Sequence, residues 1–325
     1  MHESDLPQVS DPTSGRQAHS LAARLVPIAL TVVIFCLIFW RIPFGVFWQA
    51  LSRAQLLPFL ALMGSFSLCF FLFDTFVLSK LIRWFHGPLR YRELLPVRAV
   101  TYLVSIINTQ LAQGALALYM YRRFHTPLAQ ISSTVALLIL LETTNLILFA
   151  TLGCLAFPGG APLALLLLPV VLAAIWLLVL GLARDALGRL SQRLRGSTLL
   201  SSFRRVRLYQ CLTILGLKGT VFLLALLVHS QALTFFGIMI PLPRLIALLP
   251  VVFLVGALPI TVAHLGTSQA AWIFFFSDYA SEADLLAYSL VSHLTFMLAN
   301  GSFGVLFLPR AYSDLFRTQG RSQAR

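Results

Sequence analysis

Residues 244–276 read RLIALLPVVFLVGALPITVAHLGTSQAAWIFFF, and a polar break interrupts this apolar stretch near its middle. Pro259 opens the break, and His264 and Gly266 close it. At 1.5 Å of rise per residue, apolar halves of roughly 10 to 14 residues reach about 15 to 21 Å, which is too short to cross a ~30 Å hydrocarbon core. The stretch is therefore predicted to be a broken-helix hairpin that enters a membrane and returns to the same side.

A second stretch, residues 96–121, carries a similar interruption. Asn108 and the polar residues that follow it, as far as Gln113 and Gly114, break an otherwise apolar run. Because lipid cannot hydrogen-bond to N–H and C=O groups, non-helical backbone at this depth must be buried in protein or line a wet cavity. Two breaks that enter from opposite sides predict a shared polar site near the bilayer midplane, as in inverted-repeat transporters.

The composition of the whole chain indicates a membrane protein. Its 325 residues are 58% hydrophobic and 11% charged, with a mean hydropathy of +0.86, which is too apolar for one soluble core. Residues 44–53 have the pattern of a short helix in the headgroup layer. Apolar runs near the length that spans hydrocarbon predict six full spans, at residues 25–40, 56–79, 128–156, 161–183, 208–232 and 284–308.

The predicted fold class is therefore an all-α polytopic membrane protein, with about six full transmembrane helices and two oppositely oriented re-entrant hairpins. A single transmembrane domain covers residues 23–310. Residues 1–22 are predicted to be a disordered cytoplasmic tail, and residues 311–325 a short basic cytoplasmic tail.

The threading of the two hairpins decides where the basic residues lie. If residues 96–121 crossed the membrane as a simple span, the basic residues near their start and those at 184–207 would lie on different sides of the membrane. This would violate the positive-inside rule, by which basic loops stay in the cytoplasm. With both hairpins, 20 of the 24 Lys and Arg residues lie on one side, and those elsewhere are Arg41, Arg53, Lys218 and Arg244. A multi-pass protein of the inner or plasma membrane, with both termini cytoplasmic, is expected.

Several classes of function are disfavoured. The high pI of about 10.5 follows from the positive-inside pattern, and no nucleic-acid motif accompanies it. No Gly-rich loop ends in Gly-Lys-Ser or Gly-Lys-Thr, which disfavours ATP hydrolysis. The seven Arg of residues 184–207 fit either an amphipathic helix on anionic lipid or a simple topology signal. The cysteines lie in apolar runs without metal-ligand spacing, at Cys36, Cys69, Cys154 and Cys211.

Ionisable residues inside predicted spans are the first candidates for a functional site, because each costs about 2.5 to 3.5 kcal/mol there. Asp74, Glu142, Lys218 and His293 are such residues. One interpretation is an ion pair in which Lys218 meets Glu142 or Asp74 and holds helices together. The other is a substrate site, for which Glu142, with Asn145 on the same helix face, is the better candidate.

Residues of the two breaks also have two interpretations. His264 would donate to a phosphate or carry a proton, or would simply be satisfied by backbone. Asn108, Gln113 and Gln269 are uncharged donors that suit phosphate or sugar oxygens, or else cap the half-helix ends.

Two stretches resemble the lysylphosphatidylglycerol synthase transmembrane region family, a flippase-like group. Residues 258–269, LPITVAHLGTSQ, resemble that family's late LP-x-x-x-GGLG-x-RE segment, and residues 102–123 resemble its first motif through Asn108, Gly114 and the Arg122-Arg123 pair. The chain departs from the family where His264, Ser268 and Gln269 replace Gly, Arg and Glu, and where Gly114-Ala115 replaces Gly-Glu. The resemblance implies movement of a phospholipid or lipid-linked intermediate, and gives no support for a cationic aminoacyl headgroup.

The predicted function is thus a lipid flippase, with no enzymatic activity and no cofactor, whose cavity is lined by the two hairpins. Its expected ligand is an anionic phospholipid or lipid-linked glycan. Alternatives are a membrane-embedded transferase using a lipid-linked donor, for which Glu93, Asp278, Glu282 and Asp284 form no recognisable paired-carboxylate arrangement, or a non-catalytic partner of a lipid-modifying enzyme. The predicted substrate-binding residues are Asn108, Gln113, Gly114, Arg122, Arg123, Glu142, Asn145, Pro259, His264, Gly266 and Gln269.

Overall fold

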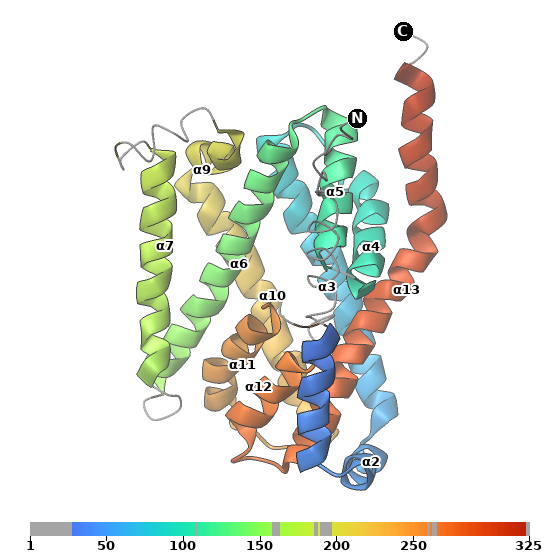
Figure 1. Cartoon of the computed structure of the whole chain (residues 1–325), viewed down its shortest axis with the longest axis vertical. Coiled ribbons are helices and arrows are strands. Elements are labelled where there is room, and N and C mark those ends of the chain that lie inside the picture. Colours follow the sequence, from blue (N-terminus) through green and yellow to red (C-terminus); the bar gives the residue numbers. More distant parts are fainter. Residues whose placement is uncertain are drawn as a thin grey trace, which may run out of the picture.

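A computed structural model describes residues 28–107, 109–157, 163–184, 188, 197–258, 261 and 265–322. All regular elements in these ranges are helices, packed side by side as a bundle (Figure 1). After a first helix at Ile28–Arg41, their bounds are α2 (Phe44–Arg53), α3 (Leu56–Phe85), α4 (Tyr91–Ile107), α5 (Thr109–Phe124), α6 (Leu128–Ala156), η1 (Leu163–Leu167), α7 (Leu168–Ala183), η2 (Thr198–Leu200), α9 (Ser201–Arg205), α10 (Leu208–Thr234), α11 (Leu242–Gly256), α12 (Thr267–Phe276) and α13 (Glu282–Ser322).

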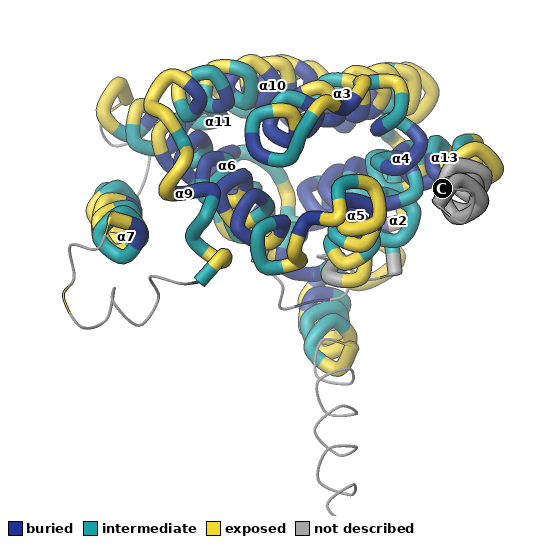
Figure 2. The backbone as a smooth tube through the Cα atoms, turned by 90° about the horizontal axis from the view of Figure 1, so that it is seen from above, coloured by how far each residue is buried: buried dark blue, intermediate teal, exposed yellow. Residues whose placement is uncertain are grey.

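The long helices confirm the all-α polytopic membrane fold. Within the described ranges, five helices are long and apolar enough to cross a membrane, and each matches a predicted span: α3, α6, residues 164–183 with α7, α10, and residues 282–310 of α13. Viewed along the bundle, dark buried surfaces face the interior and exposed surfaces face outward (Figure 2). Large apolar side chains such as Leu57 and Leu177 are among the exposed ones. Outward apolar surface of this kind is what lipid solvates.

The start of the described chain also follows the predicted layout. The helix Ile28–Arg41 matches the described part of the first predicted span, and α2 follows it after a bend of 84°. Two helices at this angle do not form one straight span. Helix α2 buries Phe47 and Ala50 and exposes Phe44 and Trp48, as expected for a helix that lies in an interface.

Both predicted hairpins are present, and they lie at opposite ends of the bundle (Figure 1). The end where α3 finishes and α6 begins is called the basic end, and the opposite one the α2 end. Helices α4 and α5 leave the basic end and return to it, whereas α11 and α12 lie towards the α2 end. With 15 and 10 residues, α11 and α12 rise about 22 and 15 Å, which is short of a full crossing.

The first hairpin differs from its prediction in two ways. A single residue, Asn108, separates α4 from α5, so Gln113 and Gly114 lie inside a regular helix and not in a break. Gln is a good helix former, and a Cβ on Gly114 would meet no atom within 4 Å, so neither residue disturbs α5. Helix α4 begins at Tyr91, which places Arg98 within the helix and not in a loop.

Glycines bring helices into close contact at two places. A Cβ on Gly304 of α13 would lie 2.5 Å from the Leu103 Cβ of α4. A Cβ on Gly153 of α6 would lie 2.5 Å from the Ala247 Cα of α11. Small residues allow this backbone approach, which is a main source of helix association in lipid. These contacts fix one arm of each hairpin against a spanning helix.

Candidate functional site

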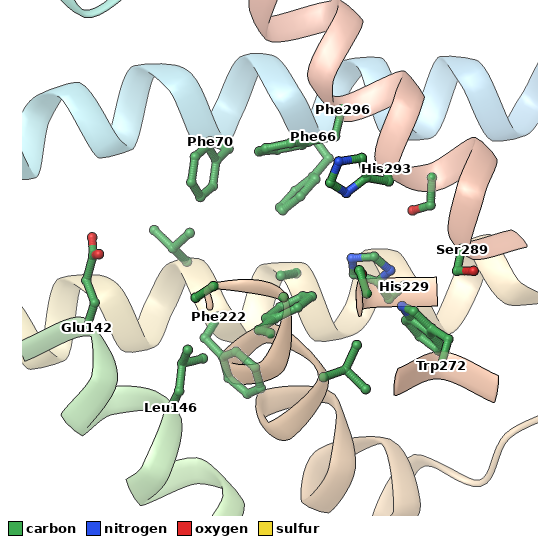
Figure 3. Close-up of a pocket in the computed structure, with 18 of the residues that line it drawn as sticks. Phe66, Phe70, Glu142, Leu146, Phe222, His229, Trp272, Ser289, His293 and Phe296 are labelled. Carbon is green, nitrogen blue, oxygen red and sulfur yellow. The ribbon is translucent and has the colours of Figure 1, made fainter. Parts of the chain in front are cut away.

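A cavity of about 510 Å³ lies inside the bundle and is mostly apolar (Figure 3). Its described walls come from α3, α6, α10, α11, α12 and α13. Glu142 is the fifteenth residue of α6, about 21 Å from that helix's start, which is near the middle of a membrane span. In Figure 3, Glu142 lies at one end, His229, His293, Ser289 and Trp272 lie at the other, and aromatic rings lie between.

Asp74 is the centre of a charged network beside the Glu142 end. Lys218 Nζ donates to Asp74 Oδ1 at 2.6 Å. Arg98 donates to Asp74 Oδ2 through Nε at 2.9 Å and through a terminal nitrogen at 2.6 Å, and the Tyr102 hydroxyl donates to the same oxygen at 2.7 Å. These donors come from α4 and α10, so one buried carboxylate of α3 joins three helices.

Lys218 extends this network to the cavity, because its ammonium also forms an ion pair with Glu142 of α6. The ion-pair interpretation is confirmed, and Lys218 meets both carboxylates instead of one. The charges of Asp74, Glu142, Arg98 and Lys218 sum to zero, which is how buried charges are tolerated in a low-dielectric interior. The side chain of Asp74 is 4% exposed and that of Glu142 is 39% exposed, so Glu142 is the carboxylate that opens on the cavity, which Lys218 also lines.

Asn145 lies one turn beyond Glu142 and also lines the cavity. Its Nδ2 donates to the Leu215 carbonyl of α10 at 2.8 Å, while its Oδ1 is buried without a hydrogen-bond partner. The predicted proximity of Asn145 to Glu142 on one helix face is therefore confirmed. An unsatisfied buried carbonyl oxygen is costly, so this wall of the cavity is suited to a hydrogen-bond donor.

The other end of the cavity contains a buried histidine. His229 Nδ1 and the Tyr288 hydroxyl are 2.6 Å apart, and the imidazole lies within ring-contact distance of Phe66, Phe253 and Trp272. His293 and Ser289 of α13 also line this end. This end offers imidazole and hydroxyl groups in an aromatic setting, in contrast to the ionic end at Glu142.

The other predicted site residues lie away from this cavity. Gln113 and Gly114 lie in α5, and Arg122 and Arg123 are exposed at the basic end, where Arg123 pairs with Glu93 at 3.3 Å. Asn108, Pro259 and His264 fall outside the described residues. Of the predicted residues, the structure brings together Glu142 and Asn145 at the cavity wall.

Gly266 and Gln269 form the start of α12. Gln269 Oε1 accepts from the Gly266 N–H at 2.6 Å, which is the capping role considered for Gln269. Gly266 has φ +93°, and a Cβ there would lie 2.9 Å from Ile34 Cγ2. A glycine is needed at this position for both its backbone angle and its close neighbour. Neither residue is among the described residues that line the cavity.

The prediction that both hairpins line the cavity is corrected in one respect. Helices α11 and α12 contribute lining residues such as Phe253, Ser268 and Trp272, whereas no described lining residue comes from α4 or α5. In its described part, helix α4 does not contact the cavity directly. Its Arg98 and Tyr102 bind Asp74 of α3, which lies between α4 and the cavity. The reason is the position of α3, whose Phe66 and Phe70 line the cavity and whose Asp74 meets Arg98.

Sequence reasoning missed Arg98, Tyr102, His229 and Tyr288 as parts of this site. His229 lies within a predicted span, so the rule that selected His293 also applies to it. Arg98 was counted among the cytoplasmic basic residues, because it lies near the start of an apolar run. No protein-family model and no curated protein matches the chain, so its function is argued from these residues.

Proposed function

We propose that this multi-pass membrane protein is a lipid flippase, which moves a phospholipid or a lipid-linked intermediate between leaflets. The observation that carries the proposal is the cavity between α3, α6, α10 and α13, near the middle of the spans, with an ionic end and a mostly apolar wall. Its volume of about 510 Å³ is within the range of pockets that bind small molecules. A headgroup fits this space, while the acyl chains remain in lipid.

The cost of the ionic groups supports a functional site. Charged side chains at this depth are rare and usually mark a substrate or ion pathway. Asp74, Arg98 and Tyr102 satisfy one another, but Glu142 lies at the cavity surface with a side chain that is 39% exposed. If the Lys218–Glu142 ion pair only held helices together, the Glu142 carboxylate would not need to lie on the cavity wall.

The opposed hairpins also support transport. Paired discontinuous helices of opposite orientation hold substrates near the midplane in many transporters. In this protein, α11 and α12 form the wall of the cavity that faces the α2 end. The resemblance of residues 258–269 to the lysylphosphatidylglycerol synthase transmembrane region family points to the same function.

A transferase is less well supported, because three of the four acids considered for it have structural contacts. Glu282 pairs with Arg41 at 2.5 Å, and Glu93 pairs with Arg123 at 3.3 Å. Asp284 accepts a hydrogen bond from Ser281 at 2.5 Å at the start of α13. Helix caps and exposed ion pairs account for these side chains.

The test is a translocation assay in proteoliposomes that contain a fluorescent phospholipid, with a membrane-impermeant quencher added outside. The wild type is expected to expose label from the inner leaflet faster than empty vesicles do. Ala225 of α10 lines the cavity, so Ala225→Phe fills the cavity and should abolish this gain. The matched control is Ala174→Phe on the exposed surface of α7, which should retain it. Equal rates for protein-containing and empty vesicles would overturn the proposal.

A further inference from the structure

We propose that Glu142 takes up a proton when a phosphate-bearing lipid headgroup binds beside Lys218, so that the cavity accepts the anion and the proton together. This inference rests on the proposed function and specifies the charge of its substrate. The shared chemistry is a phosphodiester anion, carried on either acyl or prenyl chains.

The contacts of the two carboxylates single out Glu142 as the proton acceptor. Asp74 accepts hydrogen bonds from Lys218, Arg98 and Tyr102, and its side chain is 4% exposed. Protonation of Asp74 would weaken all of these contacts. Glu142 has one ion-pair contact among the described residues, with Lys218, and its side chain is 39% exposed. A proton on Glu142 therefore disturbs less of the network and has a route from the cavity.

Charge balance explains why the proton and the anion bind together. The network of Asp74, Glu142, Arg98 and Lys218 is neutral before a headgroup arrives. A phosphodiester would add one uncompensated negative charge in a low-dielectric interior, which is costly. Proton uptake by Glu142 restores neutrality. Lys218 then keeps its bond to Asp74 and directs an ammonium N–H to a phosphate oxygen.

The other titratable groups around Glu142 define the competing explanations. Lys218 faces it from α10, and Arg98 and Tyr102 lie beyond Asp74. His229 of α10 and His293 of α13 line the far end of the cavity and are rival proton acceptors. The described lining residues of α11 and α12 carry no charge. A test must therefore separate Glu142 from the two histidines.

The experiment measures proton uptake during binding to the full-length protein in detergent, using a weakly buffered solution and a pH indicator. Dioctanoyl phosphatidylglycerol and farnesyl methyl phosphate are added separately, and dioctanoylglycerol serves as the phosphate-free control. We expect about one proton per bound phosphodiester for the wild type, and a fall in affinity of about tenfold per pH unit over the range in which binding takes up that proton. Dioctanoylglycerol should cause no uptake. Uptake with either phosphodiester supports the site.

Two variants make the result specific. Glu142→Gln keeps the shape of the side chain and should abolish both proton uptake and the pH dependence of binding. Glu93→Gln, the same change at a carboxylate that pairs with Arg123 at the basic end, should leave uptake intact. Uptake that persists in Glu142→Gln and disappears in His229→Gln or His293→Gln would overturn the assignment. Failure of both phosphodiesters to bind at any pH would also overturn it.

Failure of this inference is distinguishable from failure of the proposed function. If wild-type vesicles move labelled lipid but binding takes up no proton, the proton inference is wrong and the flippase proposal stands. If both probes bind with proton uptake but no lipid moves, the headgroup site stands and the flippase proposal is wrong.

Discussion

Lys218 of α10 donates to Asp74 of α3 at 2.6 Å, although 144 residues separate them in the chain. Asp74 also binds Arg98 of α4, and Lys218 also pairs with Glu142 of α6. One small ionic network therefore ties the first hairpin to three spanning helices. It lies directly beside the cavity, so the same contacts fix the bundle and present Glu142 to a ligand.

The two carboxylates of this network are expected to differ in their effect on stability. Asp74→Asn leaves Arg98 and Lys218 buried with too little negative charge, which should cost about 3 to 5 kcal/mol of unfolding free energy. Glu142→Gln leaves the contacts of Asp74 with Lys218, Arg98 and Tyr102 in place, so it should cost less, about 1 to 3 kcal/mol. Thermal unfolding of both variants in the same detergent measures the difference. Equal losses would contradict the central role of Asp74.

The membrane fold was predictable because its signals are local. A span is a long apolar run, and the positive-inside rule then required the two hairpins to be threaded from opposite sides. The extent of the first break was not predictable, since Gln113 and Gly114 are tolerated inside α5. A cluster of polar residues can lie inside a regular helix, as in α5, so such a cluster alone does not show where the backbone hydrogen bonds of a helix are interrupted.

The site was predictable in part for the same reason. Intramembrane charges are few, so Lys218, Glu142 and Asp74 could be matched by charge alone. Arg98 lies 24 residues from Asp74 on another helix, and its burial depends on how α4 packs against α3. The position of α4 also depends on contacts with α13, such as Gly304 with Leu103, which have no periodic sequence signal.

A close glycine contact between α6 and α11 should be sensitive to a single methyl group. Gly153→Ala would place a Cβ 2.5 Å from the Ala247 Cα, so the helices must separate, at a cost of about 1 to 3 kcal/mol. Gly64→Ala in α3 is the matched control, because its Cβ would meet nothing within 4 Å. It should be neutral or stabilising by up to about 1 kcal/mol. Unfolding midpoints of the two variants test this, and an unchanged midpoint for Gly153→Ala would contradict the close contact.

Stability is expected to fall in acid through His86, which follows α3 at the basic end. Burial, and next the nearby charge of Arg205, lower the pKa of His86 from 6.5 to about 4. The unfolded chain therefore binds this proton more tightly, and stability should decrease as pH falls from about 6.5 to about 4. His86→Gln can keep a hydrogen bond to Thr134 and should reduce the slope in this window. Unfolding midpoints across the window measure it, and an identical slope in the variant would contradict the role of His86.

The orientation of the bundle leads to a labelling prediction. Single cysteines at the exposed positions Arg122, Thr198 and Asp278 are placed in a chain whose native cysteines, Cys36, Cys69, Cys154 and Cys211, are replaced. The first two positions lie next to basic segments, and the third lies between α12 and α13 at the α2 end. A membrane-impermeant maleimide should label Arg122→Cys and Thr198→Cys from the cytoplasmic side, and Asp278→Cys from the outside.

The outcome of this labelling bears on the cavity as well as on topology. If a further cysteine at the exposed Arg90, just before α4, reacts from the cytoplasm while Thr198→Cys reacts from the outside, residues 91–124 do not return to the side they entered, and α4 cannot bring Arg98 to Asp74 within a hairpin. Opposite labelling of all four positions, Arg90→Cys included, would instead keep the hairpins and invert the protein. In the inverted protein, α11 and α12 would close the cavity on its cytoplasmic side. Glu142 would then take up its proton from the cytoplasm.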